Sequence, residues 1–226
     1  FNKAAGTTAP VTAADMGDGF LLTQGYSLLW VGWQHDTPLN EGRMRVYPPI
    51  PTNHGGPIEG LVRSDIFVSD KVFARSLGDR GHIAYPVADP DDPRNVMTAR
   101  EGLTADRQVI PRERWQFARA ESDHIVPDPT MVYLDTGFEP GKIYEVVYVS
   151  ENPPIAGLGL AAIRDTISRL KYGSSDELGI THGAIDRAIA YGQSQSGRLL
   201  RTYLYDGFNE DEEGRMVFDG IMANVG

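Results

Sequence analysis

A turn of small residues separates a predicted strand from a predicted helix late in this 226-residue chain. The strand is expected over 185–193 (IDRAIAYGQ) and the helix over 196–208 (SGRLLRTYLYDGF). A strand and a helix joined so closely nearly touch at the turn, and only small side chains permit that approach. This junction limits the possible folds more than any other feature of the chain.

Strand and helix patterns alternate around the turn. Strands are predicted over 142–150 (KIYEVVYVS) and 216–226 (MVFDGIMANVG). Apolar residues at helical spacing predict a helix over 157–173. Strands that alternate with helices of ~10–15 residues are typical of parallel βαβ units. We therefore predict an α/β fold with a mostly parallel sheet and helices on both of its faces.

The remaining segments complete a three-part organisation. The apolar run 26–33 (YSLLWVGW) suits a strand buried in the same sheet, so residues 1–36 are expected to form the N-terminal part of that sheet. Frequent turn residues and short alternating stretches predict a β-rich antiparallel insertion over 37–137. The βαβαβ core is then expected over 138–226. The chain opens on Phe1 and closes within a strand-like pattern, so we expect it to be a piece of a longer polypeptide.

Composition excludes several classes of protein. The 31 Asp and Glu residues outnumber the 21 Lys and Arg residues, which argues against binding nucleic acid through phosphate neutralisation. No apolar stretch approaches the ~20 residues that span a membrane, and no signal peptide is visible. The absence of cysteine excludes disulfides, thiolate nucleophiles and Cys-ligated metals, and it suits either redox compartment. Neither a metal nor an organic cofactor is predicted.

The turn has the small-x-Ser-x-small form of a nucleophile elbow. A helix N-terminus directs free N–H groups and the positive end of its dipole at such a serine, which favours an oxyanion there. Ser194 fits the pattern better than Ser196, because two residues before and after it stand Gly192 and Ser196. Ser196 would instead have Arg198 at a position that needs a small residue.

Two other interpretations of the turn remain open. It could be an ordinary tight turn, or it could bind an anion, as the Gly-rich turns of dinucleotide folds do. The G-x-G-x-x-G and phosphate-loop patterns are both missing, which makes the second alternative the weaker one.

Residues 142–226 resemble the α/β-hydrolase domain proteins, and in particular a bacterial group that carries G-x-S-Q-[ST]-G-R before a helix. The resemblance centres on YGQSQSGRLLR, is followed by FDGIMANVG, and extends to YSLLWVGWQHD and IEGLVRSDI. It implies a serine hydrolase with Ser194 as nucleophile, an ester or related acyl substrate, and no cofactor. It also implies an oxyanion hole with the backbone N–H of Gln195 as its first donor.

The second oxyanion donor of this fold comes from the loop after the third sheet strand. If that strand is 26–33, the donor is expected at Gln34, with Trp33 and His35 as candidates to line the substrate pocket. In this fold an acid and a histidine follow the serine in chain order, whereas all five histidines here precede Ser194. We expect the acid and the histidine in sequence beyond the present chain. The alternative is a catalytically inactive, α/β-hydrolase-like binding or structural protein.

Overall fold

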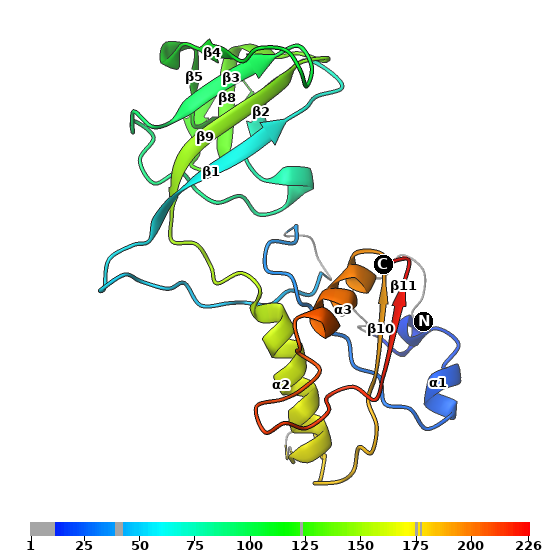
Figure 1. The fold of residues 1–226 in the computed structure, drawn as a ribbon. Coiled ribbons are helices and arrows are strands. Elements are labelled where there is room, and N and C mark those ends of the chain that lie inside the picture. Colours follow the sequence, from blue (N-terminus) through cyan, green and yellow to red (C-terminus); the bar gives the residue numbers. More distant parts are fainter. Residues whose placement is uncertain (1–11, 39–42, 123, 175, 177) are drawn as a thin grey trace. The chain divides into compact units, whose positions relative to one another are not determined.

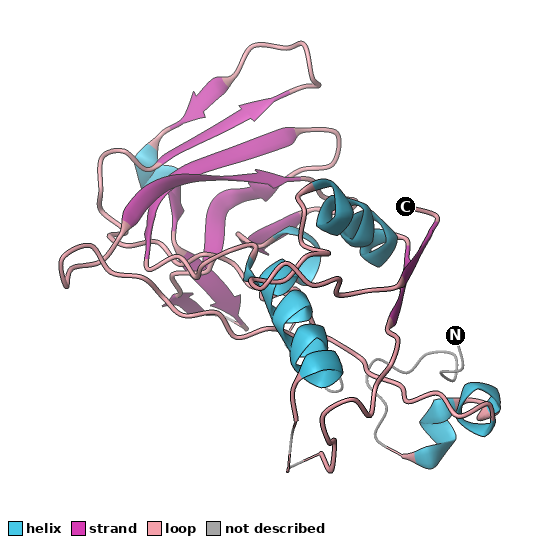
Figure 2. Ribbon diagram, turned by 60° about the horizontal axis from the view of Figure 1, so that its bottom comes forward, coloured by secondary structure: helices cyan, strands magenta, loops and turns pink. Residues whose placement is uncertain are grey.

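The computed structural model describes residues 12–38, 43–122, 124–174, 176 and 178–226, and these divide into two compact units. Unit 1 comprises 1–35, 44–47 and 156–226, and unit 2 comprises 36–43 and 48–155. The two longest helices belong to unit 1 and most strands belong to unit 2 (Figures 1 and 2). In the part of the chain that the structure describes, no helix has the length and apolarity required to cross a membrane.

Unit 2 is built from antiparallel strands, and it extends to residue 155, beyond the end of the β-rich insertion predicted over 37–137. They form a four-stranded sheet in the order β1-β9-β3-β4, a three-stranded sheet in the order β2-β8-β5, and the pair β6-β7. The strands are β1 (Glu59–Ile66), β2 (Val72–Ser76), β3 (Val96–Arg100), β4 (Gln108–Ile110), β5 (Trp115–Gln116), β6 (Ala118–Glu121), β7 (His124–Pro127), β8 (Met131–Phe138) and β9 (Ile143–Glu151). Short 3-10 helices lie at η2 (Asp79–Gly81) and η3 (Arg112–Arg114).

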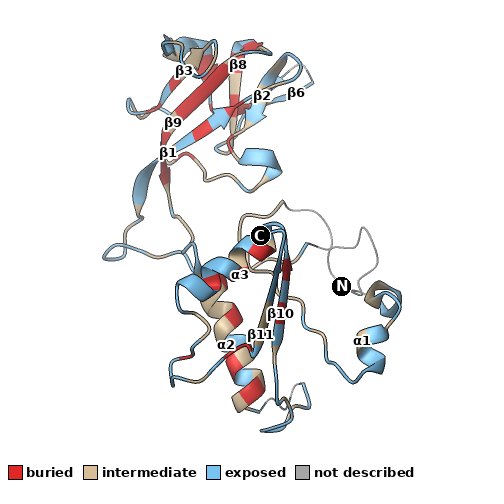
Figure 3. Cartoon of the chain, turned by 45° about the vertical axis from the view of Figure 1, so that its right-hand side comes forward, coloured by how far each residue is buried: buried red, intermediate tan, exposed pale blue. Residues whose placement is uncertain are grey.

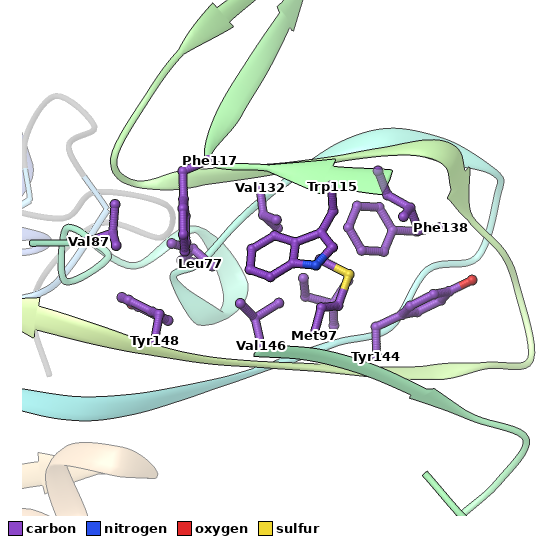
Figure 4. Packing of buried hydrophobic residues seen from close by; sticks show 12 residues of the cluster. Leu77, Val87, Met97, Trp115, Phe117, Val132, Phe138, Tyr144, Val146 and Tyr148 are labelled. Atoms are coloured by element: carbon purple, nitrogen blue, oxygen red, sulfur yellow. The ribbon is translucent and has the colours of Figure 1, made fainter. Parts of the chain in front are cut away.

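The core of unit 2 lies between its two larger sheets. Alternate side chains of β9 (Tyr144, Val146 and Tyr148) face the buried side chains of β5 and β8, among them Trp115 and Val132 (Figure 4). Their alternation follows from the two-residue period of a strand, which sends every second side chain to the same face. The cluster draws all its buried members from unit 2, so this unit has a core of its own.

The chain enters and leaves the main part of unit 2 at neighbouring points. The N–H of Ile155 donates to the carbonyl of Pro49 (3.1 Å), and the N–H of Asn152 donates to the carbonyl of Ile58 (3.0 Å). These bonds tie the first and last residues of 48–155 to each other.

The structure corrects the prediction of a parallel strand over 142–150. Strand β9 pairs antiparallel with β1 and β3, with Val147 opposite both Arg63 and Val96. As the strand between these two neighbours, it is buried at almost every position. A continuous apolar run of this kind is also what a parallel strand shows, so the sequence did not reveal the direction of its partners.

Unit 1 contains the strand–helix–strand motif that the sequence predicted around the turn. Its elements are η1 (Ala13–Met16), α1 (Phe20–Thr23), α2 (Leu158–Tyr172), β10 (Ile189–Gln193), α3 (Gln195–Tyr205) and β11 (Gly220–Asn224). Strands β10 and β11 pair in parallel, with Tyr191 opposite Met222. The core of this unit includes Ile163, Leu200 and Tyr203, and Figure 3 marks its buried positions in red along α2, α3 and β10.

The predicted sheet of mostly parallel strands, with helices on both faces, is not what the described residues form. Only β10 and β11 pair in parallel, and every other strand pair among the described residues is antiparallel. The predicted strand 26–33 is also wrong, because these residues belong to no helix or strand. Tyr26 and Leu29 are each 52% exposed, so the run is not buried on both sides.

Candidate functional site

Ser194 stands alone between β10, which ends at Gln193, and α3, which begins at Gln195. Its backbone angles are φ 54° and ψ −116°, a combination that non-glycine residues rarely adopt. Two main-chain bonds hold it there. The Ser194 N–H donates to the carbonyl of Asn224 on β11 (2.9 Å), and its carbonyl accepts from the N–H of Arg198 (3.0 Å). The serine is therefore fixed, and exposed, at the carboxyl ends of two parallel strands.

Glycines allow the strand and the helix to approach each other at this point. A Cβ on Gly192 would lie within 3.0 Å of the Ser196 carbonyl group and 2.9 Å from Leu200 Cδ1. A Cβ on Gly197 would lie 2.7 Å from the Asn224 carbonyl oxygen. The small residues of the motif are thus required by the close contact of β10, α3 and β11.

The two serines of the turn have different environments. Ser196 lies in the first turn of α3 and is half-buried, and its Oγ accepts a hydrogen bond from the indole Nε1–H of Trp33 (3.3 Å). Ser194 occupies the strained apex and is exposed. The backbone at Ser194 therefore resembles that of a nucleophile elbow, a strained turn from strand to helix. Ser196 instead occupies an ordinary helical position.

The predicted oxyanion residues lie beside the turn. Gln195 occupies the first helical position of α3, where the N–H has no acceptor within the helix and the positive end of the dipole lies. The Gln34 side chain comes within 3.5 Å of the Gln195 side chain, oxygen to nitrogen. The structure thus brings Trp33 and Gln34 to the N-terminus of α3. His35, the next residue, is half-buried and ends this segment of unit 1.

Two glycines that the sequence analysis did not single out position the segment that carries Trp33. A Cβ on Gly159, at the start of α2, would lie closer than 3.0 Å to the Trp33 carbonyl oxygen. A Cβ on Gly32 would lie closer than 3.0 Å to the backbone of Met44 and Arg45. For Gly159, the signal in the sequence was the pair of glycines in GLGL (157–160), which we interpreted only as part of the predicted helix.

A charged cluster braces the other end of the two parallel strands. The buried Lys171 ammonium donates to Asp219 Oδ2 (2.9 Å) and to the carbonyls of Met216 (3.0 Å) and Val217 (3.1 Å). The same Asp219 oxygen accepts the N–H of Ala188 (2.8 Å). Hydrogen bonds from Lys171 and Ala188 lower the pKa of Asp219. Because Ala188 and Asp219 directly precede β10 and β11, this carboxylate fixes how both strands begin.

A second carboxylate, that of the buried Asp211, ties the loop before β11 to α2. The hydroxyl of Ser168 donates to it, and Arg215 contributes Nε (2.9 Å) and its own N–H (2.9 Å). These bonds, led by the one from Ser168, hold the pKa of Asp211 well below its usual range. Both carboxylates are therefore ionised parts of the scaffold that supports Ser194.

A family model described as alpha/beta hydrolase domain matches residues 96–226, which is more than half of the chain. The matched region contains the turn at Ser194, both helices that pack near it and the parallel strand pair. Neither the curated proteins nor the solved structures gave a match to the chain. The length and content of the matched region show that this chain belongs to the alpha/beta hydrolase domain family.

Proposed function

We propose that this protein is a serine hydrolase that cleaves an ester or a related acyl bond, with Ser194 as its nucleophile. Membership of the family indicates hydrolase activity in general. The backbone of Ser194 supports the finer assignment: φ 54° and ψ −116° hold an exposed serine at the apex between a parallel strand and a helix N-terminus. Strain of ~1–3 kcal/mol at such a position persists only where the surroundings impose it.

The proposed reaction uses this apex in two stages. Ser194 Oγ attacks the acyl carbon while its proton passes to a general base, and the carbonyl oxygen becomes an oxyanion. The Gln195 N–H and a main-chain donor of Gln34 stabilise that charge in the proposal. The C–O bond to the leaving group then breaks, the leaving alkoxide takes a proton, and water releases the acyl group from the serine. Serine acyl transfer of this kind requires no metal or organic cofactor.

A second candidate is a protein that has no catalytic histidine after Ser194. In α/β-hydrolases the acid and the histidine follow the serine, whereas the five histidines of this sequence precede Ser194. In this alternative the protein has the strand-to-helix turn at Ser194 but no catalytic activity. It acts as an α/β-hydrolase-like binding or structural protein.

Labelling with a fluorophosphonate distinguishes the two candidates. The reagent should phosphonylate folded, full-length protein at Ser194, as mapped by mass spectrometry of the peptide that contains the turn. Ser194→Ala should abolish labelling, whereas Ser196→Ala should keep the label on Ser194. Denatured protein serves as the control for chemical reactivity without a site. Folded protein that acquires no adduct would contradict the serine hydrolase proposal, and an adduct on Ser196 would contradict the assignment to Ser194.

A further inference from the structure

We infer, building on the proposed function, that Ser196 is a positioning residue, whose hydroxyl accepts the Trp33 indole N–H and thereby sets the position of the Gln34 main chain. The bond joins residues 163 apart in sequence, with Trp33 Nε1 3.3 Å from Ser196 Oγ. It connects the two segments to which the oxyanion donors are assigned.

Consecutive residues of the two segments face each other. Trp33 contacts Ser196, and the next residue, Gln34, approaches the preceding residue of α3, Gln195, with 3.5 Å between side-chain oxygen and nitrogen. The segment therefore runs past the first turn of α3 in a defined register. A shift of this segment would move Gln34 relative to Ser194.

Main-chain contacts hold the segment on its other sides. The Trp33 carbonyl lies against Gly159 of α2, and Gly32 lies against the backbone of Met44 and Arg45. The Gln34 carbonyl also accepts the N–H of Val46 (3.3 Å). Residues 26–34 are not part of a strand ladder. On the side of α3, the segment is held by the side-chain contacts of Trp33 and Gln34.

The residue type at position 196 supports the same conclusion. The nucleophile elbow has the pattern G-x-S-x-G, so glycine is common two residues after the nucleophile. The close approach of Gly192 involves the carbonyl group of Ser196, a main-chain feature that any small residue would present. The requirement for a small residue thus leaves the hydroxyl unexplained, and its contact with the half-buried indole gives it a function.

Removing either partner of the bond should slow the reaction, and removing the Ser196 hydroxyl should leave substrate binding nearly unchanged. We expect Ser196→Ala and Trp33→Phe each to lower kcat for a short acyl ester about tenfold, a smaller loss than the ~100-fold or more that removal of an oxyanion donor costs. For Ser196→Ala, KM should change by less than about twofold, because the lost interaction acts on the transition state. Ser196→Thr, which keeps the hydroxyl, should restore kcat.

The double variant and a spectroscopic measurement separate positioning from general packing. Trp33→Phe combined with Ser196→Ala should be no slower than either single variant, because both remove the same bond. In ¹⁵N-labelled full-length protein, Ser196→Ala should shift the Trp33 indole N–H resonance upfield and speed its exchange with solvent. Ser196→Thr should leave the resonance near its wild-type position, and Ser194→Ala is the control that retains the bond.

The outcomes distinguish failure of this inference from failure of the proposed function. Wild-type kcat in Ser196→Ala, additive losses in the double variant, or an unshifted indole resonance would overturn the role of Ser196 even if Ser194 is labelled. A wild-type protein that is not labelled at Ser194 would overturn the proposed function. In that case the indole resonance still reports whether Ser196 holds Trp33.

Discussion

Ser194 is held in a conformation that its side chain opposes. Its φ of 54° is close to the left-handed helical value, but its ψ of −116° is far from it. The hydrogen bonds to Asn224 and from Arg198 hold this geometry, so β11 and α3 jointly maintain the strain. The energy stored at the serine is therefore provided by the packing of the elements on either side of it.

Relief of this strain can be measured by comparing two substitutions. Ser194→Gly should have a free energy of unfolding about 1 kcal/mol higher than Ser194→Ala, because glycine has no Cβ to oppose the positive φ. Urea denaturation of both variants gives this difference, and both should lose labelling. Equal stability of the two variants would show that the apex is not strained.

Gly192 is required for the contact between β10 and α3. Gly192→Ala should lower the free energy of unfolding by about 3 kcal/mol, since the new methyl group meets the rigid main chain of Ser196. The matched control is Gly60→Ala on β1, where an added Cβ meets nothing within 4 Å. Chemical denaturation should show almost no change for the control. A neutral Gly192→Ala would contradict the close approach at the elbow.

At the scale of elements, one carboxylate links α2 to the starts of β10 and β11. Asp219 receives the Lys171 ammonium and the Ala188 N–H, and both lower its pKa in the folded state. A carboxylate with a depressed folded pKa stabilises the protein above its unfolded pKa of ~3.9 and loses this contribution as the pH falls.

Stability should therefore decrease as the pH falls below about 4, in part because Asp219 takes up a proton. Urea unfolding between pH 6 and pH 3 should show a shallower decrease for Asp219→Asn than for the wild-type protein, since the amide has no proton to gain. Asp206→Asn, on an exposed residue after α3, is the control and should keep the wild-type slope. Identical slopes for Asp219→Asn and the wild-type protein would exclude Asp219 from the acid response.

Helices and turns with a characteristic local sequence pattern could be predicted. The strands with which a predicted strand pairs could not. The periodic apolar residues placed α2 within one residue of its observed ends, and the small-residue turn located the junction of β10 and α3. Residues 26–33 and β9 are both apolar runs, and no local pattern distinguishes an extended segment, an antiparallel strand and a parallel strand. The contact of Trp33 with Ser196 spans 163 residues, so no local pattern in the sequence reveals it.

At the scale of the whole molecule, the described residues form two buried hydrophobic clusters, one in each unit. The buried cluster of unit 2 runs from Ile66 to Tyr148, and that of unit 1 runs from Ile163 to Phe218. Among the residues that the structure describes, neither cluster includes a buried member of the other unit. Each core can therefore be assembled without the other.

The isolated segment 48–155 should fold alone, because it contains the whole buried cluster of unit 2. We expect a β-type circular dichroism spectrum and a cooperative thermal transition. Phe138→Ala should lower the stability of this segment by ~3–5 kcal/mol, because the fully buried ring packs edge-on against Tyr144. Phe73→Ala, on a ring that is 45% exposed, is the milder comparison. A disordered spectrum for 48–155 would show that unit 2 depends on unit 1.

The bond between Ile155 and Pro49 has a consequence for how such a chain can evolve. Pro49 and Ile155 are bonded to each other near the two ends of 48–155, so the chain enters and leaves this segment at neighbouring positions. Recombination at these two neighbouring positions could insert, exchange or delete the segment as one unit. Related proteins could then differ in the sequence or length of this segment while every residue of the serine elbow stays unchanged.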